Sequence, residues 1–320
     1  MSDFIVQQAE NPDAPFAVFI MGPTATGKTD LAIACAEALP MSIISVDSAM
    51  VYKGMDIGSA KPDVVTLNRA PHRLIDIQDP AEAYSAGQFC EDALSEMEAI
   101  SIGGKVPLLV GGTMLYFNAL QKGMADMPDA DPEIRLKLEE EAGRVGWQEM
   151  HQRLAEIDPE SARRLHPNDP QRIQRALEVY EISGKTLTEF WLEQKSRSLP
   201  YRLIKIALMP PDRTELRKRI EQRFDAMLVA GLVEEVRQLY ERSSLSPDMS
   251  SMKSVGYRQI WAYLDGEYDY ATMREKAIIA TAQLAKRQMT WLRGEANCNY
   301  LDPGELNASK VLKNLKILLS

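Results

Sequence analysis

The stretch Gly22-Pro-Thr-Ala-Thr-Gly-Lys-Thr29 matches the pattern G-x-x-x-x-G-K-[ST] at every constrained position. An apolar run at 17–21 precedes it and a segment rich in Ala and Leu at 30–39 follows it, which predicts a strand, a glycine-rich loop and a helix. In such a loop successive backbone N–H groups point inward at an anion, and the helix adds its positive dipole end. The ammonium of Lys28 suits a phosphate, and the hydroxyl of Thr29 suits Mg²⁺. We therefore expect a phosphate-binding loop that consists of Gly22, Pro23, Thr24, Ala25, Thr26, Gly27, Lys28 and Thr29.

Other apolar runs predict the fold around this loop. Short runs at 42–46, 74–77, 106–110 and 203–209 predict buried strands, with helical segments between them. Alternating strands and helices are typical of an α/β protein with a parallel sheet. Residues 125–197 contain charged, amphipathic segments and little strand pattern. We expect a P-loop NTPase-like parallel sheet core made of 1–124 and 198–320, with C-terminal helices and a helical insertion domain at 125–197.

The composition narrows the class of protein. With 45% hydrophobic and 26% charged residues, the 320-residue chain resembles ordinary soluble proteins. A net charge of −9 argues against a nonspecific nucleic-acid coat but leaves room for a local basic patch. The three cysteines and three histidines lack disulfide or metal-ligand spacing. Because no run suits a secretory signal or a membrane span, we expect a cytoplasmic protein without a membrane partner.

Asp47 directly follows the strand predicted at 42–46. Ligands of open α/β sheets bind beyond the carboxyl ends of the strands, so we expect Asp47 to face the substrate opposite the phosphates. The alternative is that Asp47 only caps a turn beside Ser48. The strand at 106–110 ends in Gly111-Gly112-Thr113 rather than in the acidic residue typical of a nucleotide triphosphatase. The loop is therefore better suited to hold a diphosphate than to hydrolyse a triphosphate.

The stretch Asp47-Ser-Ala-Met-Val-Tyr-Lys-Gly-Met-Asp-Ile-Gly-Ser-Ala-Lys-Pro62 is similar to the hallmark sequence of the tRNA dimethylallyltransferases, also called tRNA isopentenyltransferases. Further segments resemble later motifs of that family: Gly111-Gly-Thr-Met-Leu-Tyr116, Gln171-Arg-Ile-Gln-Arg175, Arg219-Ile-Glu-Gln-Arg-Phe224, Val255-Gly-Tyr-Arg258 and Ala285-Lys-Arg-Gln288. The resemblance runs in order from about 17 to 293. Because the chain ends without the Cys/His zinc finger of some eukaryotic relatives, it resembles the bacterial type.

The resemblance implies transfer of a dimethylallyl group from dimethylallyl diphosphate to N6 of adenosine 37 in tRNAs that read codons beginning with U. The products would be N6-isopentenyladenosine and diphosphate. Asp47 would be the general base, Thr113 would lie near the reacting atoms, and Arg223 would reach the diphosphate. Arg219 lies four residues before Arg223, on the same helix face, and would join it. The alternative is that both arginines are solvated or pair with Glu215 and Glu221. Mg²⁺ at Thr29 would be the cofactor.

The resemblance also implies that the insertion grips the anticodon stem-loop of tRNA. Arg163, Arg164, Arg172 and Arg175 form a local basic patch there, and a solvated helix face is the alternative. The residues expected to contact tRNA are Asp47, Ser48, Ala49, Met50, Gln171, Arg172, Ile173, Gln174, Arg175, Lys253, Gly256, Tyr257, Arg258, Lys286, Arg287 and Gln288. The lack of a long apolar seam favours a monomer.

Three other functions remain open from the sequence. An adenylate isopentenyltransferase would use a free nucleotide, but the arginines of the insertion favour tRNA. A small-molecule P-loop kinase would use Asp47 to activate a hydroxyl group. A noncatalytic RNA-binding module would have no use for Lys28 and Thr29 opposite Asp47.

Overall fold

The computed structural model describes residues 3–123, 125, 127–193 and 199–319, which form two compact units. The first unit combines Met1–Gln121 with Ser198–Ser320, and the second is Lys122–Arg197. Each unit has a hydrophobic core of its own. The division falls close to the boundaries that the sequence suggested at 124/125 and 197/198.

The first unit is built around a six-stranded parallel sheet with the strand order β3-β2-β4-β1-β5-β6. The strands are β1 (Phe16–Met21), β2 (Met41–Val46), β3 (His72–Arg73), β4 (Val106–Gly111), β5 (Arg202–Leu208) and β6 (Cys298–Leu301). The expected α/β class with a parallel sheet and a helical insertion is confirmed. The strand β6 was not predicted.

The strand predicted at 74–77 is wrong. The structure has β3 at His72–Arg73 instead, and the chain leaves the sheet directly afterwards. Leu74 and Asp76 adopt φ angles of 61° and 55°. These left-handed conformations lie outside the β region, so an apolar run at this point does not extend the strand.

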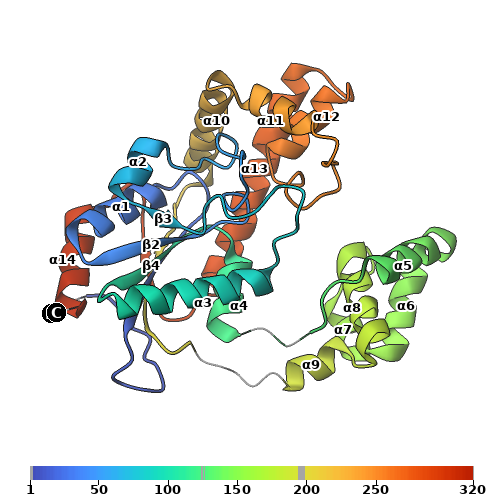
Figure 1. Cartoon of the computed structure of the whole chain (residues 1–320), viewed down its shortest axis with the longest axis horizontal. Helices are drawn as coiled ribbons and strands as arrows, with labels where there is room; N and C mark the ends of the chain where they lie inside the picture. The colour runs from blue at the N-terminus through green and yellow to red at the C-terminus, as the bar shows by residue number, and fades with distance from the viewer. Residues whose placement is uncertain (1–2, 124, 126, 194–198, 320) are drawn as a thin grey trace. The chain divides into compact units, whose positions relative to one another are not determined.

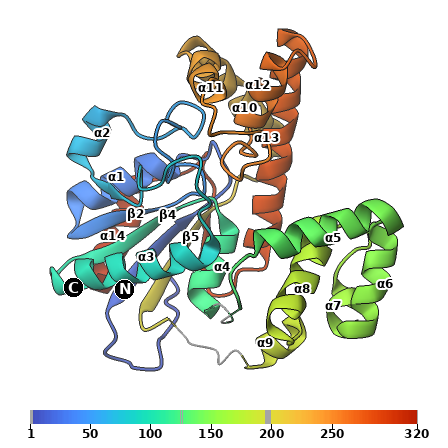
Figure 2. The ribbon, with the colours of Figure 1, turned by 45° about the vertical axis from the view of Figure 1, so that its right-hand side comes forward.

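Helices cover both faces of the sheet. Val18 and Ile20 of β1 pack with α1 (Lys28–Ala38) and α14 (Ala308–Leu319), whereas Phe19 and Met21 pack with α3 (Ala86–Ile102) and α4 (Met114–Lys122). The alternation follows from the two-residue period of a strand. Figures 1 and 2 both show α1 beside α14 on one face and α3 on the other.

Besides the cores on the two faces of the sheet, the first unit has a third core among its remaining helices. It brings α10 (Arg213–Val229), α11 (Leu232–Tyr240), α12 (Tyr257–Leu264) and α13 (Tyr270–Arg293) together with Val51, Tyr52 and Met55. The short helix α2 is Val64–Arg69. The segment after Asp47 is thus packed against helices that are more than 150 residues later in the chain, which makes this region a meeting point of distant segments.

The second unit is entirely helical in its described part. It contains α5 (Pro132–Val145), α6 (Trp147–Ile157), α7 (Pro159–Arg164), α8 (Pro170–Ser183) and α9 (Leu187–Glu193). Three of these helices begin with proline after an aspartate cap, namely Asp131, Asp158 and Asp169. Proline suits the first helical turn, and the aspartate side chain accepts otherwise unpaired backbone N–H groups. None of the described helices has the length and apolar character that crossing a membrane requires.

Candidate active site

The phosphate loop connects β1 with the start of α1, as the sequence predicted. Thr26 Oγ1 donates a hydrogen bond of 2.8 Å to the Pro23 carbonyl, and this contact closes the loop on itself. Lys28 Nζ donates to the same carbonyl oxygen at 2.7 Å. The ammonium therefore lies over its own loop, where the oxygens of a bound anion would replace the carbonyl as its partner.

Two cations and one carboxylate converge on this loop. The pKa of Lys28 is lowered to about 8, chiefly by burial and also by the positive charge of Arg223, while Asp47 opposes the shift. Burial also lowers the pKa of Arg223, against the opposing effect of Asp47 and Asp30. Arg223 reaches the loop from α10. Adjacent cations that are partly removed from water provide a site for an anion with several negative charges.

Asp47 and Thr113 lie together beyond the ends of two adjacent strands, β2 and β4. Thr113 Oγ1 accepts a hydrogen bond from the Ser48 backbone N–H at 3.1 Å and donates to Ser48 Oγ at 3.4 Å. The close approach requires glycine at position 111, because a Cβ there would lie 1.9 Å from the Val46 carbonyl oxygen. The motif at 111–116 is thereby held against the first residues of the hallmark stretch.

Asp47 also caps the turn that follows it, which was the alternative role left open by the sequence. Its Oδ1 accepts from the backbone N–H groups of Ala49 at 2.9 Å and Met50 at 3.3 Å. Within the described part of the chain, Oδ2 accepts no hydrogen bond. The two functions do not exclude each other, because a carboxylate can use one oxygen for the turn and the other for a substrate.

Arg219 pairs with a neighbouring acid of its own helix. Its Nε lies 3.4 Å from Glu215 Oε1, one turn earlier on α10. Both side chains are partly exposed, so water screens this pair and a diphosphate can compete for Arg219, whose place in the diphosphate set stays a prediction.

The hallmark stretch is anchored by Glu235, which the sequence did not identify as part of the site, and by Tyr257, which it expected to contact tRNA. Glu235 of α11 accepts the backbone N–H groups of Asp56, Ile57 and Gly58 at 3.0, 2.7 and 3.1 Å. The Tyr257 hydroxyl donates to the same carboxylate at 2.6 Å. A carboxylate that accepts this many hydrogen bonds fixes the segment rigidly. Residues 56–58 and Tyr257 lie in motifs of the family resemblance, whereas Glu235 lies in none of them and gave no sequence signal.

Four residues expected to contact tRNA are buried. Ile173 belongs to the core of the helical unit, and Gly256 and Tyr257 are buried at the start of α12. Gln288 uses its amide to hold two loops. These expectations are corrected, because a motif contains packing residues as well as contact residues. The exposed members of the set are Ser48, Gln171, Arg172, Lys253, Arg258, Lys286 and Arg287, and the partly exposed ones are Asp47, Ala49, Met50, Gln174 and Arg175.

The four arginines of the expected basic patch are each paired with an acid. Arg163 and Arg164 share Glu160, and Arg172 lies 3.4 Å from Asp169. These pairs are exposed, so water screens them and a nucleic-acid phosphate can compete for the arginines. From the sequence, Asp169 was the only acid expected near this patch. Glu160 is a second one, and it reduces the net positive charge of the patch.

Arg175 differs from the other three arginines. It pairs at 2.7 Å with Glu178, whose side chain is fully buried, and it donates to the Pro128 carbonyl at 2.6 Å. Arg135 pairs with the same carboxylate at 2.8 Å. Arg175 therefore holds the segment that enters the helical unit.

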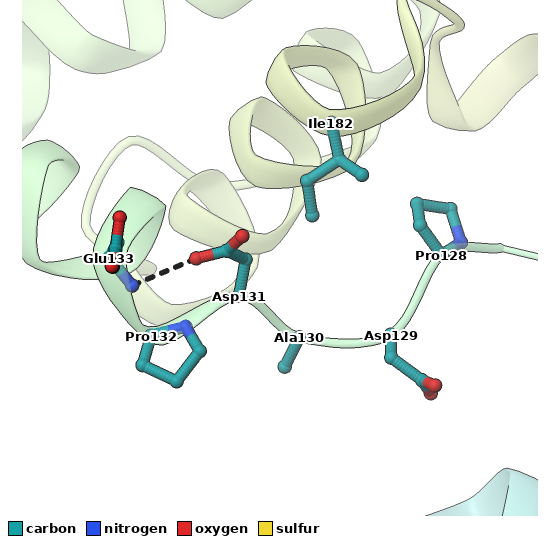
Figure 3. A pocket seen from close by; sticks show the side chains of 7 residues that line it. All are labelled: Pro128, Asp129, Ala130, Asp131, Pro132, Glu133 and Ile182. Carbon is teal, nitrogen blue, oxygen red and sulfur yellow. Dashed lines mark hydrogen bonds between the residues drawn. The ribbon is translucent and has the colours of Figure 1, made fainter.

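A pocket in the helical unit contains none of the expected site residues. It is lined by Pro128, Asp129, Ala130, Asp131, Pro132, Glu133 and Ile182 (Figure 3). Asp131 Oδ1 accepts the Glu133 N–H at 2.8 Å, as the dashed line in Figure 3 marks, so this carboxylate caps α5. Its acidic lining suits neither a diphosphate nor RNA.

Comparison with known proteins identifies related sequences and structures. The family model described as IPP transferase matches residues 50–295, and the model described as Isopentenyl transferase matches 16–80. The tRNA dimethylallyltransferase of Thioalkalivibrio sulfidiphilus is 57% identical over 305 residues, which are 95% of each chain. That of Coxiella burnetii is 58% identical over 279 residues, covering 87% of this chain and 90% of the relative.

Solved structures resemble the chain as well. The tRNA isopentenylpyrophosphate transferase of Bacillus halodurans is 35% identical, with a TM-score of 0.69 and coverage of 95% of both chains. A eukaryotic dimethylallyltransferase, described as acting on tRNA, is 26% identical, with a TM-score of 0.78. The similarity to it covers 95% of this chain and 77% of that one.

Proposed function

The chain belongs to the IPP transferase family, and from this we propose that it transfers the dimethylallyl group of dimethylallyl diphosphate to N6 of adenosine 37 in tRNAs that read codons beginning with U. Relatives named tRNA dimethylallyltransferase match nearly the whole chain. The observation that carries the proposal is the convergence of Lys28 and Arg223 with Asp47 at the phosphate loop.

Each of these groups has its own task in the proposed reaction. The bond between the allylic carbon and the diphosphate oxygen breaks, and the N6 nitrogen forms a bond to that carbon. Lys28, Arg223 and the loop amides stabilise the negative charge that develops on the departing diphosphate. Asp47 accepts the proton that the exocyclic amine loses, through the oxygen that the turn does not use. Thr113 holds the turn that carries Asp47.

We also propose that Mg²⁺ binds with the diphosphate. Among the described residues, no group of three or more His, Cys, Asp or Glu side chains could hold a metal ion. This fits Mg²⁺ in a phosphate loop, where one protein ligand, water and the phosphate oxygens complete the shell. The Thr29 hydroxyl, in the first turn of α1, would be that ligand. When bound, the ion would neutralise part of the charge of the leaving group.

The proposed polynucleotide substrate is the anticodon stem-loop of tRNA. Ser48, Lys253, Arg258, Lys286 and Arg287 are exposed on the catalytic unit. The exposed Gln171 and Arg172 offer contacts from the helical unit. The target base must leave its loop to reach Asp47, which costs a few kcal/mol and least in a single-stranded loop. We further propose that the protein acts as a cytoplasmic monomer.

A transfer assay tests the proposal. The protein, Mg²⁺ and labelled dimethylallyl diphosphate are incubated with unmodified tRNA, with the same tRNA carrying guanosine at position 37, or with free AMP. Label on the first tRNA alone supports the proposal. Label on AMP alone would identify an adenylate isopentenyltransferase. In a parallel incubation with ATP, consumption of ATP without any prenyl transfer would identify a kinase.

A further inference from the structure

The side-chain amide of Gln288 bridges two loops that are far apart in the sequence. Its Oε1 accepts a hydrogen bond from the Thr24 backbone N–H at 3.1 Å. Its Nε2 donates to the Gly112 carbonyl oxygen at 2.8 Å. Gln288 is buried and belongs to α13.

The Gln288 side-chain amide links β1 and β4 just beyond their last paired residues. The parallel pairing of β1 with β4 has Met21 opposite Gly111 as its last pair. A Cβ at position 112 would lie 3.3 Å from the Gly22 carbonyl oxygen and 2.5 Å from Gln288 Nε2. The two strands are thus still close when they turn into loops, and Gln288 supplies one donor and one acceptor, as a backbone rung would.

The two bridged loops carry the two halves of the proposed site. Thr24 belongs to the phosphate loop, which would hold the leaving group. Gly112 precedes Thr113, whose hydroxyl holds Ser48 next to the proposed base Asp47. A misplacement of about 1 Å between reacting groups can lower a rate by about 100-fold.

We propose that Gln288 is a positioning residue that sets the separation between the diphosphate cradle and the Asp47–Thr113 pair. It touches neither substrate and acts through the two loops. The inference rests on the proposed function, because the separation matters only when a group crosses from one loop to the other.

The test compares Gln288→Leu with the wild type. The variant retains the bulk of the side chain and loses both hydrogen bonds. Calorimetric titration with dimethylallyl diphosphate in the absence of tRNA gives the fraction of protein with an intact cradle. We expect the affinity to change less than about threefold, whereas the transfer rate per diphosphate site falls at least about tenfold.

A second readout is the ratio in which the allylic group is transferred to water or to tRNA. Loss of folded protein would not change this ratio. In a misaligned site, water attacks the allylic carbon and yields dimethylallyl alcohol, diphosphate and a proton. Gln288→Leu should raise the ratio of alcohol to prenylated tRNA at least about fivefold. The control is Gln283→Leu, the same change at an exposed position of α13, which should leave both values unchanged.

Gln288→Glu adds a pH-dependent rescue. A protonated carboxyl group has one donor and one acceptor, as the amide has, whereas a carboxylate has no donor for the Gly112 carbonyl. The rate of this variant relative to the wild type should therefore rise as the pH falls from 8.5 to 6. A per-site rate of Gln288→Leu within threefold of the wild type, an unchanged partition ratio or a flat pH profile of Gln288→Glu would overturn the inference. A wild type that transfers nothing would overturn the proposed function instead.

Discussion

The ammonium of Lys28 donates its hydrogen bond to the carbonyl oxygen of Pro23, five residues earlier in its own phosphate loop. The loop is therefore organised before any anion enters. A binding site that already has its bound geometry loses less conformational entropy on binding. Before an anion binds, the pKa of Lys28 is lowered to about 8, chiefly by burial.

The affinity for dimethylallyl diphosphate should be constant below pH 8 and fall above it. A bound diphosphate favours the charged ammonium and raises the pKa of Lys28 again. Above pH 8 the complex therefore holds more protons than the free protein, and the affinity falls by up to about tenfold per pH unit. Calorimetry at pH 7 to 9.5, in buffers of different ionisation enthalpy, should detect proton uptake. Lys28→Arg, which remains charged, should bind with little dependence on pH, and an equal decline in this variant would contradict the assignment.

Replacing Asp47 by Asn should separate its two functions. Asparagine keeps an oxygen that can accept the N–H groups of Ala49 and Met50, but it cannot take a proton from the amine. We expect a loss of about 10²–10⁴-fold in transfer rate with an unchanged thermal midpoint. Asp47→Ala should lose the same activity and also about 1 kcal/mol of stability, because the turn loses its cap. Equal activity of Asp47→Asn and the wild type would exclude Asp47 as the base.

The sequence predicts those parts of the protein whose information is local. The phosphate loop, the strands at 17–21, 42–46, 106–110 and 203–209 and the helical insertion each follow from a motif or an apolar pattern within a few residues. The prediction at 74–77 failed because Leu74 and Asp76 adopt left-handed conformations, which an apolar pattern does not reveal.

Contacts between distant segments account for the rest. Gln288 bonds to Thr24, 264 residues away, and Glu235 bonds to Ile57, 178 residues away. No periodicity links such positions, so the sequence assigned Gln288 and Tyr257 to an RNA surface on the strength of their motifs alone. The structure assigns both to the interior, where they hold loops of the site.

Removal of the Glu235 carboxylate should destabilise the catalytic unit. Glu235→Ala leaves three backbone N–H groups and the Tyr257 hydroxyl without their acceptor, and we expect a loss of about 3 kcal/mol in the free energy of unfolding. Tyr257→Phe, which removes one bond, should lose about 1 kcal/mol. Urea denaturation measures both. The control is Glu234→Ala, whose exposed pair with Arg237 should contribute less than about 0.5 kcal/mol. Losses no larger than this control would contradict the anchoring role.

Alanine substitutions of Arg172 and Arg175, which lie in one motif, should affect different properties of the protein. Arg172 is exposed and pairs loosely with Asp169, so Arg172→Ala should leave stability within about 0.5 kcal/mol. It should weaken tRNA binding and reduce the slope of log K against log salt by about 1. Arg175→Ala leaves the buried Glu178 with one arginine, Arg135, in place of two and should cost about 2 kcal/mol. Binding measured over a salt series and thermal unfolding distinguish the two. Equal losses of stability would contradict the separation.

Glycine should be tolerated at position 25, although alanine stands there. Ala25 has a φ of 63°, a left-handed conformation that costs a residue with a Cβ about 1 kcal/mol. Ala25→Gly removes this strain but gives the unfolded chain more freedom, which offsets about 0.4–1 kcal/mol. We therefore expect stability to change by less than about 0.5 kcal/mol, with diphosphate affinity retained. In Ala34→Gly, within α1, no strain is relieved and the loss should be about 1 kcal/mol. If both variants lost the same stability in urea denaturation, the left-handed conformation of Ala25 would be excluded in solution.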